Sequence, residues 1–149
     1  MDEIASPRGE CLARVPNQRG EAMNETIRSD GLPFTISDHW PRPSVCLVRL
    51  AGELDAATAA AVIGFLRDTT VRNPAHLVLD LAGVRFLASA GVGIIMAAMR
   101  NADGIRGQLH LVGVADNLIV SRVLDITGVL PLLDVHPGLE HLLASLGHD

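Results

Sequence analysis

The sequence predicts an α/β domain, with a mixed, mainly parallel sheet of four to five strands covered by about four helices. From residue 32 onward, short apolar runs alternate with longer stretches of helical periodicity. This alternation is typical of parallel strands joined by right-handed crossovers. The chain has 149 residues, enough for one hydrophobic core. Aromatic residues make up only 3% of the sequence, so Ala, Val, Leu and Ile must build that core.

Residues 1–31 differ from the rest of the chain. They are polar, interrupted by Gly and Pro, and show no apolar periodicity. We therefore expect a disordered or loosely attached N-terminal arm, followed by one domain over residues 32–149. Translation starts at Met1 or at Met23, and the sequence leaves both possibilities open.

The domain begins with two strands. Residues 33–37 and 45–51 are short apolar segments, and Trp-Pro-Arg-Pro at residues 40–43 predicts a turn between them. Residues 56–70 then place apolar side chains at helical spacing. Asp55 directly precedes this segment and is well placed to cap the predicted helix.

Residues 76–81 predict a strand that is covered on both faces. Asn73 and Pro74 end the preceding helix, and the following run is almost entirely apolar, as expected for a central strand. The remaining expected elements are a helix from Ser89 to Asp103 ended by Gly104, a strand at 108–114 preceded by Gly107, a helix at 115–127 ended by Gly128, a strand at 132–136, and a helix from Pro137 to Gly147.

Two loops point to the functional edge of this sheet. Residues 52–55 and 82–89 each follow a strand and lead into a helix N-terminus. Loops at the carboxyl ends of parallel strands form the usual functional edge of such a fold. We therefore expect Asp55 and Ser89 to lie on the same edge, with Asp80 close below them.

The start of the helix after Ser89 has two interpretations. Ser89 is a good capping residue, and Gly91 and Gly93 would then serve only close packing. Alternatively, the glycines expose backbone N–H groups, and a phosphate on Ser89 would meet these groups and the positive end of the helix dipole. Such a phosphate would turn an apolar docking edge into a charged one.

Composition excludes several classes of partner. The net charge is −5, and the chain has neither a block of Lys and Arg nor a set of aromatic residues for base stacking, so we expect no nucleic-acid partner. No apolar run reaches the ~18 residues of a membrane span, and the N-terminus has no signal-peptide pattern. We therefore expect a cytoplasmic protein without membrane contact. Cys11 and Cys46 have no metal-ligand spacing and are interpreted as ordinary thiols.

Several motifs resemble one known family. These are Gly-Glu-Leu-Asp at residues 52–55, Val-Leu-Asp-Leu-Ala-Gly-Val-Arg-Phe-Leu-Ala-Ser-Ala-Gly-Val-Gly at 78–93, and the segments 109–114 and 120–129. In order and spacing they resemble the STAS domain of anti-sigma-factor antagonists, over about residues 32–146. The family's phosphorylation motif places the acceptor serine on Ser89 and an accepted variant on Ala90. Its preceding aspartate falls on Ala88, which is a departure from the family pattern.

The resemblance implies a regulatory switch and not an enzyme, with no cofactor or metal. Such a protein binds an anti-sigma factor, often a serine kinase of the histidine-kinase-like ATPase type, and thereby frees the sigma factor. Phosphorylation of Ser89 by this partner would stop binding, and a phosphatase would restore it. The residues implied for partner binding are Asp55, Ala88, Ala90, Gly91 and Val92.

Three alternatives remain beside the switch. A hydrolase with Ser89 as nucleophile would need a base, but none of the six histidines has a telling spacing and no Gly-x-Ser-x-Gly elbow is present. Nucleotide binding rests on Gly91 and Gly93 alone, because Met96 replaces the third glycine of that motif. The third is a non-phosphorylated STAS scaffold, or a ligand- or nucleotide-sensing interaction module, with Ala88 marking the loss of the switch.

Overall fold

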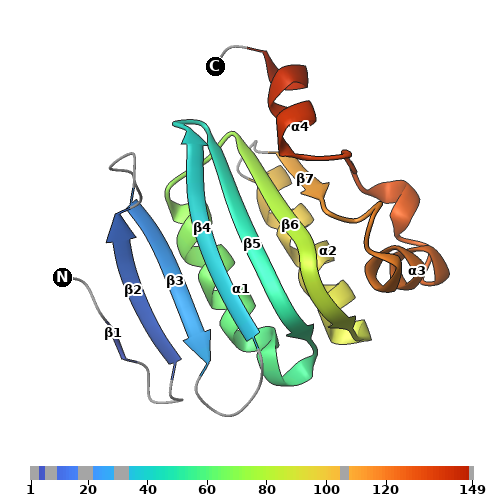
Figure 1. Ribbon diagram of the computed structural model, residues 1–149, viewed down its shortest axis with the longest axis horizontal. Coiled ribbons are helices and arrows are strands. Elements are labelled where there is room, and N and C mark those ends of the chain that lie inside the picture. Colours follow the sequence, from blue (N-terminus) through green and yellow to red (C-terminus); the bar gives the residue numbers. More distant parts are fainter. Residues whose placement is uncertain (1–3, 6–9, 17–21, 29–33, 105–107, 148–149) are drawn as a thin grey trace.

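The computed structural model describes residues 4–5, 10–16, 22–28, 34–104 and 108–147, and shows a mixed sheet with helices against it (Figure 1). Seven strands lie in chain order across the sheet: β1 (Ile4–Ala5), β2 (Glu10–Pro16), β3 (Ala22–Arg28), β4 (Phe34–Arg42), β5 (Val45–Leu54), β6 (His76–Leu87) and β7 (Gln108–Val112). The helices are α1 (Ala56–Val71), α2 (Ser89–Gly104), α3 (Leu118–Ile126), α4 (Leu139–Leu146) and a short 3-10 helix, η1 (Leu130–Leu132). The predicted α/β class with four α-helices is confirmed.

The sheet is parallel at one side and antiparallel at the other. β5 pairs with β6 and β6 pairs with β7 in parallel, whereas β4 pairs with β5 antiparallel. Two of the three pairings among β4–β7 are therefore parallel, as the sequence predicts. The pairings that involve β1, β2 and β3 are antiparallel, so the prediction of a mainly parallel sheet holds only for β4–β7.

The three N-terminal strands differ from the expectation for residues 1–31. The structure has regular strands there, and β3 pairs with β4 through Asn24–Asp38 and the three following pairs. Backbone hydrogen bonds of a hairpin need no apolar periodicity, which explains why the pattern gave no sign of them. The predicted boundary at residues 31 and 32 lies outside the described residues.

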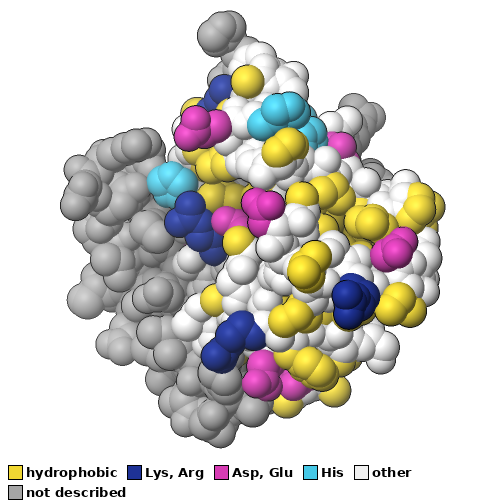
Figure 2. Space-filling model, turned by 45° about the vertical axis from the view of Figure 1, so that its right-hand side comes forward, with side chains coloured by type: hydrophobic (Ala, Val, Ile, Leu, Met, Phe, Trp, Pro, Cys, Tyr) yellow, Lys and Arg dark blue, Asp and Glu magenta, His cyan; other side chains and the backbone are white. Residues whose placement is uncertain are grey.

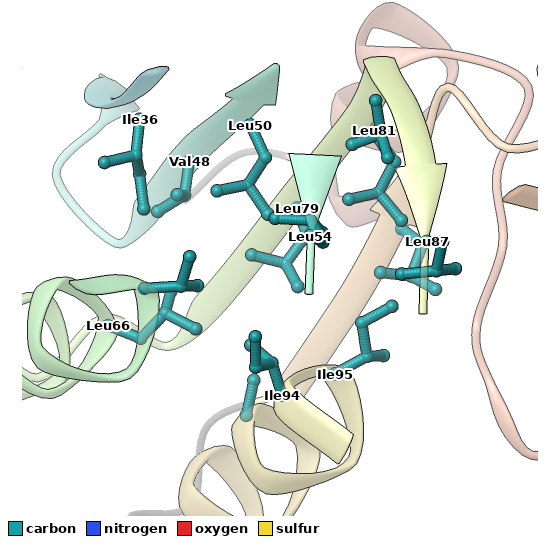
Figure 3. Close-up of a cluster of buried hydrophobic side chains, with 14 of the residues drawn as sticks. Ile36, Val48, Leu50, Leu54, Leu66, Leu79, Leu81, Leu87, Ile94 and Ile95 are labelled. Carbon is teal, nitrogen blue, oxygen red and sulfur yellow. The ribbon is translucent and has the colours of Figure 1, made fainter. Parts of the chain in front are cut away.

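Helices cover one face of the sheet, and α4 covers one end of the other face. α1 and α2 lie against one face (Figure 1), where Cys46, Val48 and Leu50 of β5 point into the main core. Val45 and Leu47 point to the other face, which Leu142 of α4 covers. Alternate residues of a strand point to opposite faces, so β5 is apolar on both faces only in its first half, before the exposed Arg49. At the ends of β5 and β6, Leu54 and Leu87 point toward Ile94 and Ile95 of α2 (Figure 3).

Several boundaries differ from the sequence prediction. The turn predicted at 40–43 is confined to residues 43–44, because β4 continues through Trp40 and Pro41. β6 likewise extends to Leu87, so most of the loop predicted at 82–89 is strand. The strand predicted at 132–136 is wrong. Its start belongs to η1, and its remainder makes only one isolated bridge, Leu111 to Val135.

α4 is attached to the sheet near its C-terminal end. The Arg42 guanidinium on β4 donates hydrogen bonds to the carbonyl of Leu143 at 3.0 Å and to that of Gly147 at 2.6 Å. A cation at this end of a helix satisfies unpaired carbonyls and complements the helix dipole. α4 is therefore held on the sheet by the hydrogen bonds from Arg42 as well as by the packing of Leu142.

Candidate functional site

A backbone hydrogen bond joins the two predicted functional loops. The N–H of Ala88, between β6 and α2, donates to the carbonyl of Leu54, at the end of β5, over 2.9 Å. Asp55 and Ser89 are the residues that follow this bonded pair in the two loops. The expected shared edge is confirmed. Asp80 is seven residues before Leu87 on β6, or ~23 Å along the strand, and pairs instead with Arg49.

Asp55 has a structural task at this edge. Its carboxylate accepts hydrogen bonds from the N–H groups of Ala57 and Thr58, at 3.0 and 3.1 Å. The Thr58 hydroxyl in turn accepts from the Asp55 N–H at 3.1 Å, which completes a capping box. The predicted N-cap of α1 is confirmed. The side chain remains partly exposed, so it is also accessible to a partner.

Ser89 is not the cap of α2. The Ala88 carbonyl accepts from the N–H groups of Gly91 and Val92, at 2.9 and 3.1 Å, so Ala88 holds the cap position and Ser89 is the first helical residue. The capping interpretation of Ser89 is therefore wrong by one residue. Ser89 is exposed, and its hydroxyl has no hydrogen-bond partner within the described part of the chain.

The two glycines near the start of α2, Gly91 and Gly93, have different surroundings. A Cβ on Gly91 would lie 2.5 Å from Leu87 Cδ1 and 2.8 Å from the Leu54 carbonyl oxygen, so only glycine allows this close approach. A Cβ on Gly93 would have nothing within 4 Å. Gly93 is exposed and lies four residues after Ser89, on the same helix face.

The predicted partner-binding residues differ in exposure. Asp55, Ala88 and Ala90 are partly exposed, whereas Gly91 and Val92 are buried, Val92 with 8% of its surface exposed. Gly91 and Val92 can thus affect a docking surface only by fixing the position of the helix. The partner-binding role of all five residues stays a prediction.

An apolar groove that was not predicted reaches Leu87, two residues before Ser89. It has a volume of about 390 Å³ and is lined by Phe86 and Leu87 of β6 and by Leu118, Ile119, Arg122 and Val123 of α3. Phe86 is 50% exposed and Leu118 72% exposed. Figure 2 shows hydrophobic side chains spread over the face that carries α3.

The sequence pattern of α3 did not indicate this groove. Ile119, Val123 and Ile126 have the spacing of one apolar helix face, but the buried residues of α3 are Val120 and Leu124. Ile119 and Ile126 are therefore available at the surface. The apolar residues of this helix were the only sign of a groove in the sequence. The rotation of α3 about its own axis decides which of them are buried.

Asn117 holds α3 in place at the groove. Its side-chain amide donates to the carbonyls of Leu81 at 3.0 Å and Val84 at 2.8 Å, and its carbonyl oxygen accepts from the Val120 N–H at 3.3 Å. One residue thus caps α3 and ties it to the second half of β6.

Among the described residues, one group could hold a metal ion: His110 of β7, Asp134 and His136. This group does not include any residue of the edge formed by Asp55 and Ser89.

The chain is thus a small α/β domain in which α2 begins with the Ser89 hydroxyl, and an apolar groove lies along the end of β6. The STAS domain model matches residues 41–142, and the chain belongs to this family.

Among the described residues, no helix is both long enough and apolar enough to span a membrane.

The relatives point to one regulatory group. The chain is 37% identical over 68 residues to the anti-sigma-F factor antagonist RsfB of Mycobacterium tuberculosis, a match that covers 46% of this chain and 53% of RsfB. It thus spans about half the length of that relative. It is 31% identical over 86 residues to the anti-sigma-B factor antagonist of Listeria monocytogenes, covering 58% of this chain and 74% of the relative.

A solved structure agrees on the fold. The crystal structure of an anti-sigma factor antagonist from Mycobacterium paratuberculosis superposes with a TM-score of 0.63 at 20% identity. The superposition covers 97% of this chain and 100% of that one. At this identity the likeness shows the shared fold alone.

Proposed function

We propose that the chain is an anti-sigma-factor antagonist that binds its anti-sigma factor through a docking face at the start of α2. This docking face consists of Asp55, Ala88, Ser89, Ala90 and the apolar groove between Phe86 and α3. The names of the two curated relatives support this function. By binding the anti-sigma factor, the chain would free the sigma factor.

The observation that carries the switch is the position of the Ser89 hydroxyl. It is exposed at the first position of α2, and the cap residue before it, Ala88, has no side-chain oxygen. The first N–H groups of a helix, here those of Ser89 and Ala90, have no carbonyl of their own helix to pair with. A phosphate on Ser89 would be attracted to these groups and to the helix dipole.

Phosphorylation would then oppose docking by electrostatics and hydration. A phosphate adds about −1.5 to −2 charges and three acceptor oxygens. A partner that covers the groove would have to remove water from this group, which is costly in an apolar contact. A cost of about 2.7 kcal/mol weakens binding about a hundredfold.

The reversible cycle needs two further partners. In this proposal the anti-sigma factor is itself a serine kinase of the histidine-kinase-like ATPase type, and a phosphatase removes the phosphate. Both would act on the exposed Ser89 hydroxyl in the cytoplasm. The chain would serve as a binding protein, with its own residues performing no catalysis.

The test compares variants in binding to each anti-sigma factor from the same genome, by pull-down and calorimetric titration. Ser89→Ala should bind as the wild type does, and Ser89→Glu should lose binding. Ser145→Glu is the matched control, because it makes the same change on the exposed side of α4, at the other end of the strands (Figure 1). Equal affinities of Ser89→Ala and Ser89→Glu would refute the switch.

The presence of alanine at position 88 supports a second candidate, a STAS scaffold without phosphorylation. In this chain, the cap residue before the serine provides no acidic group. Incubation with the binding anti-sigma factor and ATP, followed by intact-mass measurement, separates the two. A gain of one phosphate that Ser89→Ala lacks supports the switch, and an unchanged mass with retained binding supports the scaffold.

A further inference from the structure

Four histidines lie in a row on the sheet face that carries α4, away from the docking face. The ring centroids of His76 and His110 are 5.2 Å apart, those of His110 and His136 5.4 Å, and those of His136 and His141 5.9 Å. Asp134 lies between two of them. Figure 2 shows histidine side chains gathered in this part of the surface.

The backbone brings these residues together from three separate segments. His110 pairs in register with Val78 in the β6–β7 ladder, so it points to the same face as His76 and Val78. The Leu111 N–H donates to the Asp134 carbonyl, and the His136 N–H donates to the Leu111 carbonyl, both at 2.8 Å. These two bonds flank the isolated Leu111–Val135 bridge. Asp134 and His136 therefore share the face of His110.

One carboxylate oxygen lies at the centre of this group. Asp134 Oδ2 is 2.5 Å from His110 Nδ1 and 3.0 Å from His136 Nε2. One donor atom from each residue lies within 4.8 Å of the others. In a tetrahedral zinc site with bonds of about 2.0–2.1 Å, ligand atoms are about 3.3 Å apart. To reach that spacing, the two histidine nitrogens would move by less than 1 Å away from Asp134 Oδ2.

The donor types suit a cation. Burial lowers the pKa of His110 below its ordinary value, against the opposing effect of Asp134. Burial acts to raise the pKa of Asp134, but hydrogen bonds from His136 and His110 and their charges together lower it. Imidazole nitrogens and carboxylate oxygens are ligands that zinc uses in proteins.

The surroundings supply an orienting contact and an access route. His76 Nδ1 lies 3.1 Å from His110 Nε2, so it can accept a hydrogen bond from the Nε2–H group when His110 Nδ1 binds an ion. Such a partner fixes the ring orientation of a ligating histidine. The His110 side chain is only 4% exposed, whereas that of Asp134 is 55% exposed. An ion can therefore enter from the Asp134 side and keep a water ligand there.

We propose that His110, Asp134 and His136 bind a divalent cation of the zinc class, with water as the fourth ligand. The ligand set of two imidazoles and one carboxylate is one that zinc uses when a coordination position stays open to solvent. The ion would link β7 to the segment before α4. It would stabilise the native chain, since this arrangement of ligands requires the folded sheet.

The test is titration of the chelator-treated, tag-free full chain with zinc chloride, followed by calorimetry. The wild type should bind one ion, and Co²⁺ should give the visible absorption bands of tetrahedral coordination. Asp134→Asn and His136→Gln should each weaken binding at least tenfold, a loss of about 1.4 kcal/mol or more. His39→Ala, which changes a histidine on β4 outside the cluster, should leave the affinity unchanged.

Circular dichroism and thermal unfolding without metal show whether each variant is folded. Asp134→Asn keeps the size of an exposed side chain, so it should retain the fold even if His136→Gln does not. Two outcomes would overturn the proposal: a wild type that binds no zinc, or a folded Asp134→Asn variant with wild-type affinity. The second would mean that Asp134 and the two histidines form only a hydrogen-bonded network.

Discussion

The N–H of Ala88 donates to the carbonyl of Leu54 over 2.9 Å, and this single bond connects the starts of two helices. Asp55 caps α1 one residue after Leu54, and Ser89 begins α2 one residue after Ala88. Because both loops are only one residue long, neither helix start can move far from the other. The docking face therefore depends on how closely α2 approaches the end of β5.

Gly91 permits this close approach. Gly91→Ala places a Cβ within 2.9 Å of Leu54 and Leu87 atoms, so we expect it to lower the free energy of unfolding by about 1–3 kcal/mol. Gly93→Ala is the matched control in the same helix. Its Cβ meets open space, and loss of glycine should raise the free energy of unfolding by about 0.5–1 kcal/mol. Urea unfolding measures both, and equal effects would contradict the packing role of Gly91.

Ala88 leaves the N-terminus of α2 without a side-chain cap. Ala88→Asp should raise the free energy of unfolding by about 1 kcal/mol, because a cap carboxylate accepts hydrogen bonds from first-turn N–H groups. Chemical unfolding of the variant against the wild type checks this. Ala57→Asp, at an exposed position inside the first turn of α1, is the comparison, since Asp55 already caps that helix. A destabilised Ala88→Asp would show that the cap position is not free.

The apolar groove should contribute to partner binding. Leu118→Glu introduces a charge at a 72% exposed side chain of the groove, so affinity for the anti-sigma factor should fall about tenfold or more. The free energy of unfolding should change by less than about 0.5 kcal/mol, as for other exposed sites. Val71→Glu, at a 78% exposed side chain at the far end of α1, should leave binding intact. If both variants bind equally well, the groove is not part of the docking face.

Cys46 should react with thiol reagents only when the chain unfolds. Burial, with a further contribution from Asp38, raises the pKa of this thiol far above its ordinary range, although Arg72 acts in the opposite direction. In a Cys11→Ser background, native-state labelling at pH 8 should be slow and should become rapid in urea. Fast labelling of the native chain would contradict the burial of Cys46.

The same shift predicts a loss of stability in alkali. A thiol whose pKa is raised in the folded state adds stability that is present below about pH 8.5 and is lost as the pH rises further, when only the unfolded chain releases the proton. The wild type should therefore lose stability between pH 8 and pH 10 more steeply than Cys46→Ala does. Parallel slopes in urea unfolding would contradict this expectation.

The local patterns of the sequence determined much of the domain beyond residue 34. The apolar run at 76–81 predicted a central strand, Asp55 predicted the start of α1, and Gly104 marked the end of α2. Each of these depends on neighbouring residues alone. The strands before residue 29 and the end of β6 were missed, because they are defined by pairing with other strands and have no periodicity of their own.

By itself, the sequence determined the α/β class, the resemblance to the STAS family, and Ser89 as the residue of interest. Capping signals, strand runs and motifs are local and can be read in order along the chain. Only the tertiary structure decided that Ala88 caps α2, that Gly91 and not Gly93 is packed, and that Ile119 faces solvent. It also brought His110 next to Asp134 and His136, more than twenty residues further along the chain. Such contacts depend on the register of strands and the rotation of helices, which the packing of the whole core determines.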